Sequence, residues 1–136
     1  MTYALAAGLQ QAVYEKLAND TTLQGLVGSA VFDAPPEGGL PDFYVSLGPE
    51  TVIDRSDKTE AGAVHRFTVS VVTDAASFHS AKTAAGAVTD ALVDASLSLP
   101  RGRLTSLHFV RATARRGRKA ARRRIDLTFR ASLDDA

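Results

Sequence analysis

The sequence contains no cysteine among its 136 residues. Disulfide bridges and thiolate metal ligands are therefore excluded, and nothing points to an oxidising compartment. Tryptophan is also absent, and no uninterrupted apolar run approaches the ~20 residues that span a bilayer. The first thirty residues carry Glu15, Lys16 and Asp20 and lack the pattern of a secretion signal. We therefore expect a soluble protein that is made in a cytoplasm and has no membrane partner.

Motifs for catalysis and for cofactors are missing as well. The glycines lack the spacing of a phosphate-binding loop, and no G-x-S-x-G motif marks a nucleophilic serine. The three histidines have no H-x-x-x-H spacing, so packed or solvated imidazoles are favoured over zinc ligands. The acidic residues Asp54, Asp57 and Glu60 lack the central glycine of a calcium loop. The sequence predicts no enzyme, no cofactor and no metal site.

The apolar pattern predicts one domain over residues 1–136, with helices and strands in a mixed order. Leucine or valine recurs every fourth residue within 3–18, which predicts an amphipathic helix. A short second helix should start at a cap from Asp20 or Thr21 and end at Gly28. A third helix is expected from Ser77 or Ser80 to about residue 95, with an alanine-rich face.

Alternating apolar and polar residues predict the strands. Short strands are expected at 30–33, 42–47 and 51–54, a long strand at 63–73, and a hairpin at 104–133 made of strands 104–115 and 122–133. On the hairpin, His108 is expected to share a face with Val110. This order predicts an α+β fold: an antiparallel sheet of four to five strands with two main helices packed on one face.

The net charge of +1 conceals a strong asymmetry along the chain. Residues 1–100 hold 5 Lys/Arg and 12 Asp/Glu, whereas residues 101–136 hold 11 Lys/Arg and 3 Asp/Glu. The cations concentrate on the hairpin and its tip, at Arg111, Arg115, Arg116, Arg118, Lys119, Arg122, Arg123 and Arg124. Two or three charges would be enough to protect a sheet edge from aggregation. We therefore expect these residues to meet an anion, either DNA phosphates or acidic groups of a neighbouring copy.

The ordered set of elements resembles the small tail-completion, or tail-terminator, family of long-tailed bacteriophages and of phage-derived particles such as gene-transfer agents. The resemblance covers nearly the whole chain. It rests on the helix at 5–17, DTTLQGLVG at 20–28, VFDAPP at 31–36, YVSLG at 44–48, DRSDKT at 54–59, the strand at 65–72 and the helix at 81–92.

The resemblance implies a structural assembly protein of the virion's tail–neck junction, assembled in the bacterial cytoplasm. Such proteins form a ring of six copies that caps the tail tube and ends its polymerisation. The implied partners are further copies of the chain, the major tail tube protein, the head-side connector or stopper protein, and DNA passing through the lumen. Hairpin 104–133 would then lie at the subunit boundary or in the lumen.

Two alternative interpretations remain open at this stage. One is a head-closure or neck component of the same kind of particle. The other is a nucleic-acid-binding module that grips phosphates through the basic hairpin without reading sequence, since the hairpin tip has no aromatic side chain for base stacking.

Overall fold

A computed structural model describes residues 3–34, 38–56, 62–116 and 122–135. Along the chain, its elements are α1 (Ala6–Ala18), α2 (Thr21–Val27), β1 (Val31–Phe32), β2 (Phe43–Asp54), β3 (Gly62–Thr73), α3 (His79–Leu92), β4 (Arg103–Arg116) and β5 (Arg123–Asp134). The predicted α+β class is confirmed. None of the helices in these ranges is long and apolar enough to cross a membrane.

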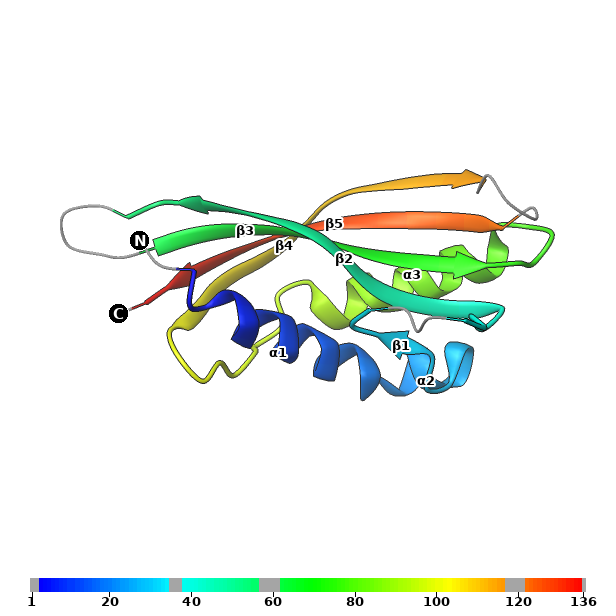
Figure 1. Ribbon diagram of the computed structural model, residues 1–136, viewed down its shortest axis with the longest axis horizontal. Coiled ribbons are helices and arrows are strands. Elements are labelled where there is room, and N and C mark those ends of the chain that lie inside the picture. The colour runs from blue at the N-terminus through cyan, green and yellow to red at the C-terminus, as the bar shows by residue number, and fades with distance from the viewer. Residues whose placement is uncertain (1–2, 35–37, 57–61, 117–121, 136) are drawn as a thin grey trace.

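The five strands form a single sheet in the order β1-β2-β3-β5-β4, and the helices lie against one face of it (Figure 1). The three pairs among β2, β3, β5 and β4 are antiparallel, as predicted. The two-residue strand β1 differs, because it runs parallel to β2. The strands at the two ends of the order are β1 and β4, so the predicted hairpin supplies one interior strand and one edge strand.

The core lies between the sheet and the helices. The predicted stripe of α1 is confirmed, since Leu9, Val13 and Leu17 are all buried. On α3 the buried positions are mostly alanines, so the helix can approach the strands closely. On β5, residues 125, 127, 129, 131 and 133 are buried and the residues between them are partly exposed, which confirms the predicted alternation.

The predicted boundaries are close to those observed, and one cap is resolved. The Asp20 side chain accepts a hydrogen bond from the Leu23 amide at 3.0 Å, so Asp20 and not Thr21 caps α2. Gly28 closes α2 with φ = 62°, a backbone conformation that favours glycine. The helix α3 ends at Leu92, three residues before the predicted end, because Val93 is extended and Asp94 has φ = 56°.

The prediction of two separate strands at 42–47 and 51–54 is wrong. The chain forms one strand, β2, whose pairing with β3 shifts register between Leu47 and Glu50. Gly48 and Pro49 are typical of a chain break, but a β-bulge accommodates both and lets the strand continue. A side chain at position 48 would be crowded, because an added Cβ would lie 3.3 Å from the Thr68 carbonyl oxygen.

Candidate functional site

In the part of the chain that the structure describes, one face of the sheet carries no helix, and we call it the helix-free face. Register partners on neighbouring strands point to the same side, so the pairing assigns each side chain of β3, β5 and β4 to one face. Arginines gather on the helix-free face at Arg66 of β3, Arg124 and Arg130 of β5, and Arg103, Arg111 and Arg115 of β4. On these three strands the same face carries two carboxylates, those of Asp126 and Asp134.

Several of these cations are direct cross-strand neighbours. Arg66 is the register partner of Arg130, which is in turn the partner of His108. Arg124 is the partner of Arg115. Adjacent strands are only ~4.8 Å apart, and like charges directly opposite one another destabilise a sheet. The fold thus holds cationic side chains close together, and their mutual repulsion lowers its stability.

Asp126 organises one end of this face. Its Oδ1 accepts hydrogen bonds from Arg124 Nε at 2.8 Å and from the buried Ser70 hydroxyl at 2.6 Å, and its Oδ2 accepts one from Arg115 at 3.2 Å. Arg124 also donates to the Ser70 hydroxyl at 3.1 Å. Burial opposes the ionisation of Asp126, but these hydrogen bonds and the two guanidinium charges outweigh it and hold its pKa below the usual range.

Replacing Asp126 by asparagine should lower the free energy of unfolding by about 1–2 kcal/mol at pH 7, because charge-assisted hydrogen bonds are lost. The folded pKa lies below the unfolded value of about 3.9, so the stabilisation is present above that value and disappears as the pH falls through the folded pKa. Urea unfolding at pH 7, 4 and 3 should therefore show the difference between wild type and D126N shrinking below pH 4.

The control variant is Asp135→Asn, which breaks the ion pair with Arg101. It should cost less than D126N at pH 7, because Asp135 bonds to one guanidinium group, whereas Asp126 bonds to two guanidinium groups and the Ser70 hydroxyl. A D126N deficit of the same size at pH 3 and pH 7 would contradict the assigned role of the carboxylate.

The structure separates the eight predicted cationic residues. Arg111, Arg115 and Arg124 lie on the helix-free face, whereas Arg116 and Arg123 are partners on the opposite side. Arg123 donates to the Ala75 carbonyl and stacks over Phe78 at the start of α3. Arg122 precedes β5, and Arg118 and Lys119 lie outside the described residues. The hairpin is therefore no single cluster, and its exposed cations continue onto β3.

The pairing of β4 with β5 is irregular next to His108. Simple alternation predicted that His108 shares a face with Val110, but the β4–β5 register shifts between Phe109 and Arg111. This bulge leaves Val110 without a register partner and puts Arg111 on the same face as His108.

The outer half of β4 is unusually exposed. Every residue from 108 to 116 is exposed, including Phe109 at 43% and Val110 at 39%. Phe109, Ala112 and Ala114 lie on the helix side of the sheet, because their register partners are the buried Phe129, Leu127 and Ile125. The helices leave this part of β4 uncovered, so the strand offers a free edge and an apolar strip. We call residues 108–116 the β4 overhang.

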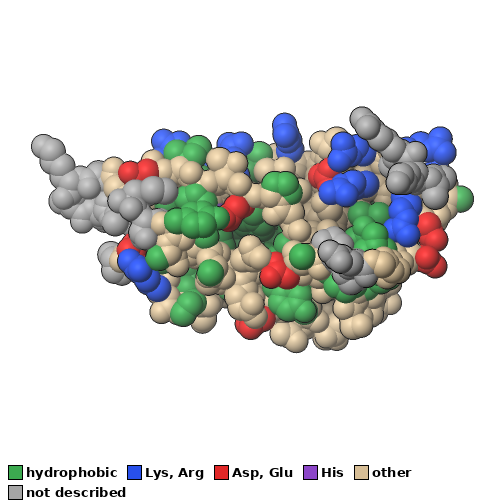
Figure 2. All heavy atoms as spheres, viewed as in Figure 1, with side chains coloured by type: hydrophobic (Ala, Val, Ile, Leu, Met, Phe, Trp, Pro, Cys, Tyr) green, Lys and Arg blue, Asp and Glu red, His purple; other side chains and the backbone are tan. Residues whose placement is uncertain are grey.

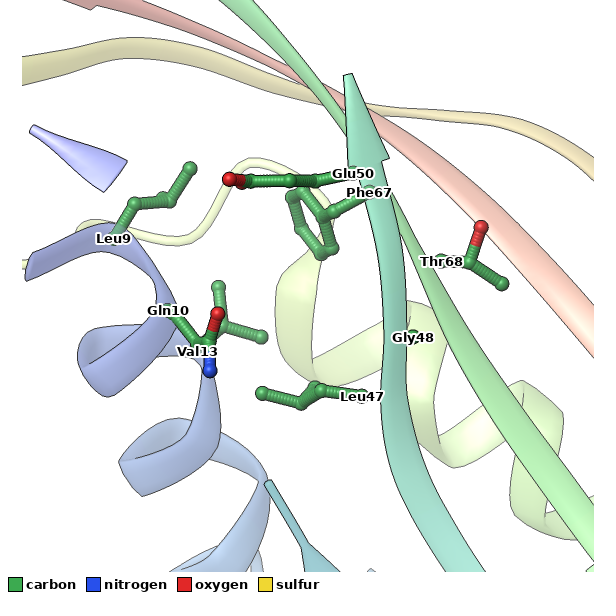
Figure 3. A pocket seen from close by; sticks show the side chains of 8 residues that line it. All are labelled: Leu9, Gln10, Val13, Leu47, Gly48, Glu50, Phe67 and Thr68. Atoms are coloured by element: carbon green, nitrogen blue, oxygen red, sulfur yellow. The ribbon is translucent and has the colours of Figure 1, made fainter. Parts of the chain in front are cut away.

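A crevice between α1 and the bulge of β2 is too small to be a substrate site (Figure 3). Leu9, Gln10 and Val13 approach it from α1, and Leu47 and Glu50 from β2. Its volume of about 20 Å³ is room for roughly one water molecule, whereas pockets for small molecules usually exceed about 300 Å³.

His65 lies in the core beside this crevice, as the packed-imidazole interpretation predicts. It is fully buried, and neither ring nitrogen has a hydrogen-bond partner among the described residues. Its Nδ1 lies 3.9 Å from a Glu50 carboxylate oxygen, which is too far for a hydrogen bond. Burial lowers the pKa of His65 despite the opposing charge of Glu50, so the imidazole is neutral at pH 7. Within the described ranges, no three His, Asp or Glu side chains are grouped to hold a metal ion.

Charge is divided between the two layers of the molecule. Figure 2 shows most of the visible Lys and Arg side chains along the margin formed by the strands and at the end where the β4–β5 hairpin lies. The helical layer bears mainly carboxylates, with Glu15 on α1, Asp20 at the N-cap of α2, Asp90 on α3 and Asp94 just after α3. The sequence asymmetry is therefore a spatial one, positive on the sheet and negative on the helices.

Comparison with known proteins identifies a protein family and similar solved structures. Residues 11–134 match the family described as "Tail completion protein gp17", a segment that runs from within α1 to the last residue of β5. The chain is also similar to a chain of the solved structure "Virion of native gene transfer agent (GTA) particle", with 61% sequence identity and a TM-score of 0.92. That similarity covers 98% of this chain and 99% of the other. Among curated protein sequences, no match is found.

Proposed function

This chain belongs to the tail completion protein gp17 family, and from that membership we propose that it forms a ring that caps the tail tube of a phage-like particle. The ring is a hexamer that ends polymerisation of the tube protein, joins the tail to the head-side connector and lets DNA pass through its lumen. The role is structural and non-enzymatic.

The observation that carries the ring proposal is the exposed β4 overhang. Proteins normally shorten, cover or heavily charge a free strand edge, because an open edge pairs with other chains. Here nine consecutive residues are exposed, and although three of them are arginines, Phe109 and Val110 are exposed among them. An exposed strand with an apolar strip is accounted for if a second copy covers it in the assembled particle.

A ring requires two different complementary surfaces on each subunit. The second candidate surface is the far end of β2. Strand β1 pairs only with Val45 and Ser46, so among the described residues no strand covers the outer edge of β2 from Glu50 to Asp54. This edge carries two carboxylates and the exposed Ile53, whereas the β4 overhang carries Arg111, Arg115 and Arg116. Opposite charges on opposite edges favour head-to-tail contacts, which form a ring when the rotation between neighbouring copies closes.

The ring proposal predicts that Val110→Asp abolishes assembly. A carboxylate at this position would be buried against the neighbouring copy, whereas it stays solvated in the free subunit. Light scattering should give about 86 kDa for a wild-type hexamer, six times the 14.4 kDa of the chain, and the mass of the single chain for V110D. Electron microscopy of particles from cells that lack the gene should show tails of irregular length. Supplying the wild-type protein to these cells should restore a uniform tail length, and supplying V110D should not.

Val93→Asp is the matched control, because Val93 is also an exposed valine, at 37%, but lies at the end of α3. V93D should assemble and should restore tail length. Normal assembly and normal tails with V110D would remove the β4 overhang from the subunit boundary.

The two alternative functions predict different outcomes. A head-closure component would appear on the head side of the connector in images of particles, and its loss would leave tail length unchanged. A free nucleic-acid-binding module would bind duplex DNA tightly as a monomer at physiological salt, whereas an isolated ring subunit should bind little under those conditions.

A further inference from the structure

The geometry points to the helix-free face as a surface that binds the phosphate backbone of duplex DNA without reading its sequence. The inference rests on the proposed function, because the lumen of the ring is what brings DNA to the subunit. The inference places the DNA contact on the helix-free face of the sheet and not on the hairpin tip.

The face holds more cations than its own carboxylates can neutralise. Asp126 is shared by Arg124 and Arg115, and Asp134 pairs with Arg103 at 3.4 Å. Both carboxylates of this part of the face are thus engaged. No ion pair to Arg66 or Arg130 is found within the described ranges, so these two guanidinium groups remain available to an external anion.

Protection of the sheet edge does not account for these residues. Arg66 lies on β3 and Arg130 on β5, and both strands are interior strands of the sheet. They are nevertheless direct cross-strand partners, with the exposed His108 next in the row. A repulsive row in the middle of a sheet is accounted for by an anion that bridges its members.

The side chains between the cationic rows suit phosphate contacts. Thr68 and Thr128 are register partners that lie next to the Arg66–Arg130 row, and both are partly exposed. Hydroxyl and guanidinium groups are the usual donors to phosphate oxygens, and such contacts carry no base information. From Arg130 to Arg124 the strand advances six residues, about 20 Å, which is long enough to reach several phosphates of a duplex.

A second copy of the chain fits this face less well than DNA does. Protein interfaces have an apolar centre that is depleted of charge. Of the exposed large apolar residues, Phe109 lies on the helix side, and Ile53 reaches the helix-free face only at its end on β2. The centre of the helix-free face is cationic and hydroxylic, which matches a polyanion.

The test removes the central row with Arg66→Gln and Arg130→Gln together in the full-length protein. Fluorescence anisotropy with a labelled 30-base-pair duplex should be recorded from 25 to 200 mM salt. Wild type should bind at low salt with equal affinity for two unrelated sequences. Each lost phosphate contact lowers the slope of log K against log salt by about 0.9, so the double variant should lose about 2 units of slope and at least about tenfold in affinity at 50 mM salt.

The control variant is Lys16→Gln with Lys82→Gln, which removes the same charge from the helical layer. It should bind DNA like wild type, and circular dichroism should confirm that both variants are folded. The inference is overturned if R66Q/R130Q binds with unchanged affinity and slope, or if wild type does not bind even at 25 mM salt. Loss of assembly by R66Q/R130Q without loss of DNA binding would assign the face to a second copy instead.

Light scattering on the same samples separates this inference from the proposed ring. If wild type binds DNA through Arg66 and Arg130 but never assembles, the ring fails and the phosphate surface stands. If all variants assemble and none binds DNA, the ring stands and the phosphate surface fails.

Discussion

Replacing Phe129 by alanine should lower the free energy of unfolding by about 3–5 kcal/mol, the largest loss expected for a single side chain of this protein. Phe129 is fully buried on β5, an interior strand of the sheet. Its ring stacks on Phe67 at a centroid distance of 5.5 Å and meets Phe109 edge-on at 6.0 Å. Alanine would leave a cavity at the centre of the layer between sheet and helices, where the surroundings relax only in part.

The control for this prediction is the same chemical change at Phe109, which is 43% exposed. Phe109→Ala removes less buried surface and should cost about 1 kcal/mol. Urea unfolding at pH 7, at a protein concentration where light scattering finds single chains, gives both values. A loss of similar size in the two variants would mean that Phe129 is not the centre of the core.

Gly102→Val should destabilise the protein by at least about 2 kcal/mol, because two separate penalties act on one residue. Gly102 precedes β4 with φ = 71°, a conformation that L side chains rarely adopt. A Cβ there would lie 2.5 Å from the Asp134 carbonyl oxygen and 3.0 Å from a methyl group of Leu5. The clash would push apart the start of β4, the end of β5 and the residue that leads into α1.

Gly28→Ala separates the two penalties at Gly102. Gly28 also has a positive φ, 62°, but an added Cβ there meets no atom within 4 Å. The G28A variant should therefore lose only the free energy of the conformational strain, about 1 kcal/mol. In thermal unfolding, the melting temperature of G102V should be clearly lower than that of G28A. Equal melting temperatures would show that the crowding at Gly102 has no energetic effect.

Helices and strands with a regular pattern could be predicted from the sequence, because buried residues recur along them at one constant spacing. The strand β5 alternates from Ile125 to Leu133 without interruption, and its faces are those expected. The strand β2 could not be predicted as one element. Gly48 and Pro49 are typical of a chain break, and only the pairing with β3 shows that a bulge absorbs them.

The sequence pattern singles out Arg111, Arg115 and Arg124 of the helix-free face. It does not single out Arg66, Arg103 or Arg130, and the reason is physical. The alternation within β3 and within β5 puts Arg66 and Arg130 on the side opposite the apolar residues of their strands. Nothing in the sequence states that two strands separated by a helix and another strand are neighbours in the sheet, so their meeting could not be foreseen. The cations of the hairpin are close together in the sequence, but Arg116 and Arg123 lie on the other side of the sheet.

The bulge at Val110 illustrates a second limit. Counting residues from His108 assigns Arg111 to the apolar side of β4, and one extra residue in the strand reverses that assignment. A bulge depends on the pairing of two strands, so the sequence of one strand does not reveal it. The family membership was foreseen from the order of the elements, which such local irregularities leave unchanged.

The division of charge between the two layers also limits which symmetries the subunit can adopt. A two-fold axis through the sheet would press Arg66 and Arg130 of one copy against the same arginines of its mate. Such a self-complementary pair would bring like charges together without any counter-ion of its own. Back-to-back dimers through this face are therefore disfavoured in solution, and copies that meet must do so through other surfaces.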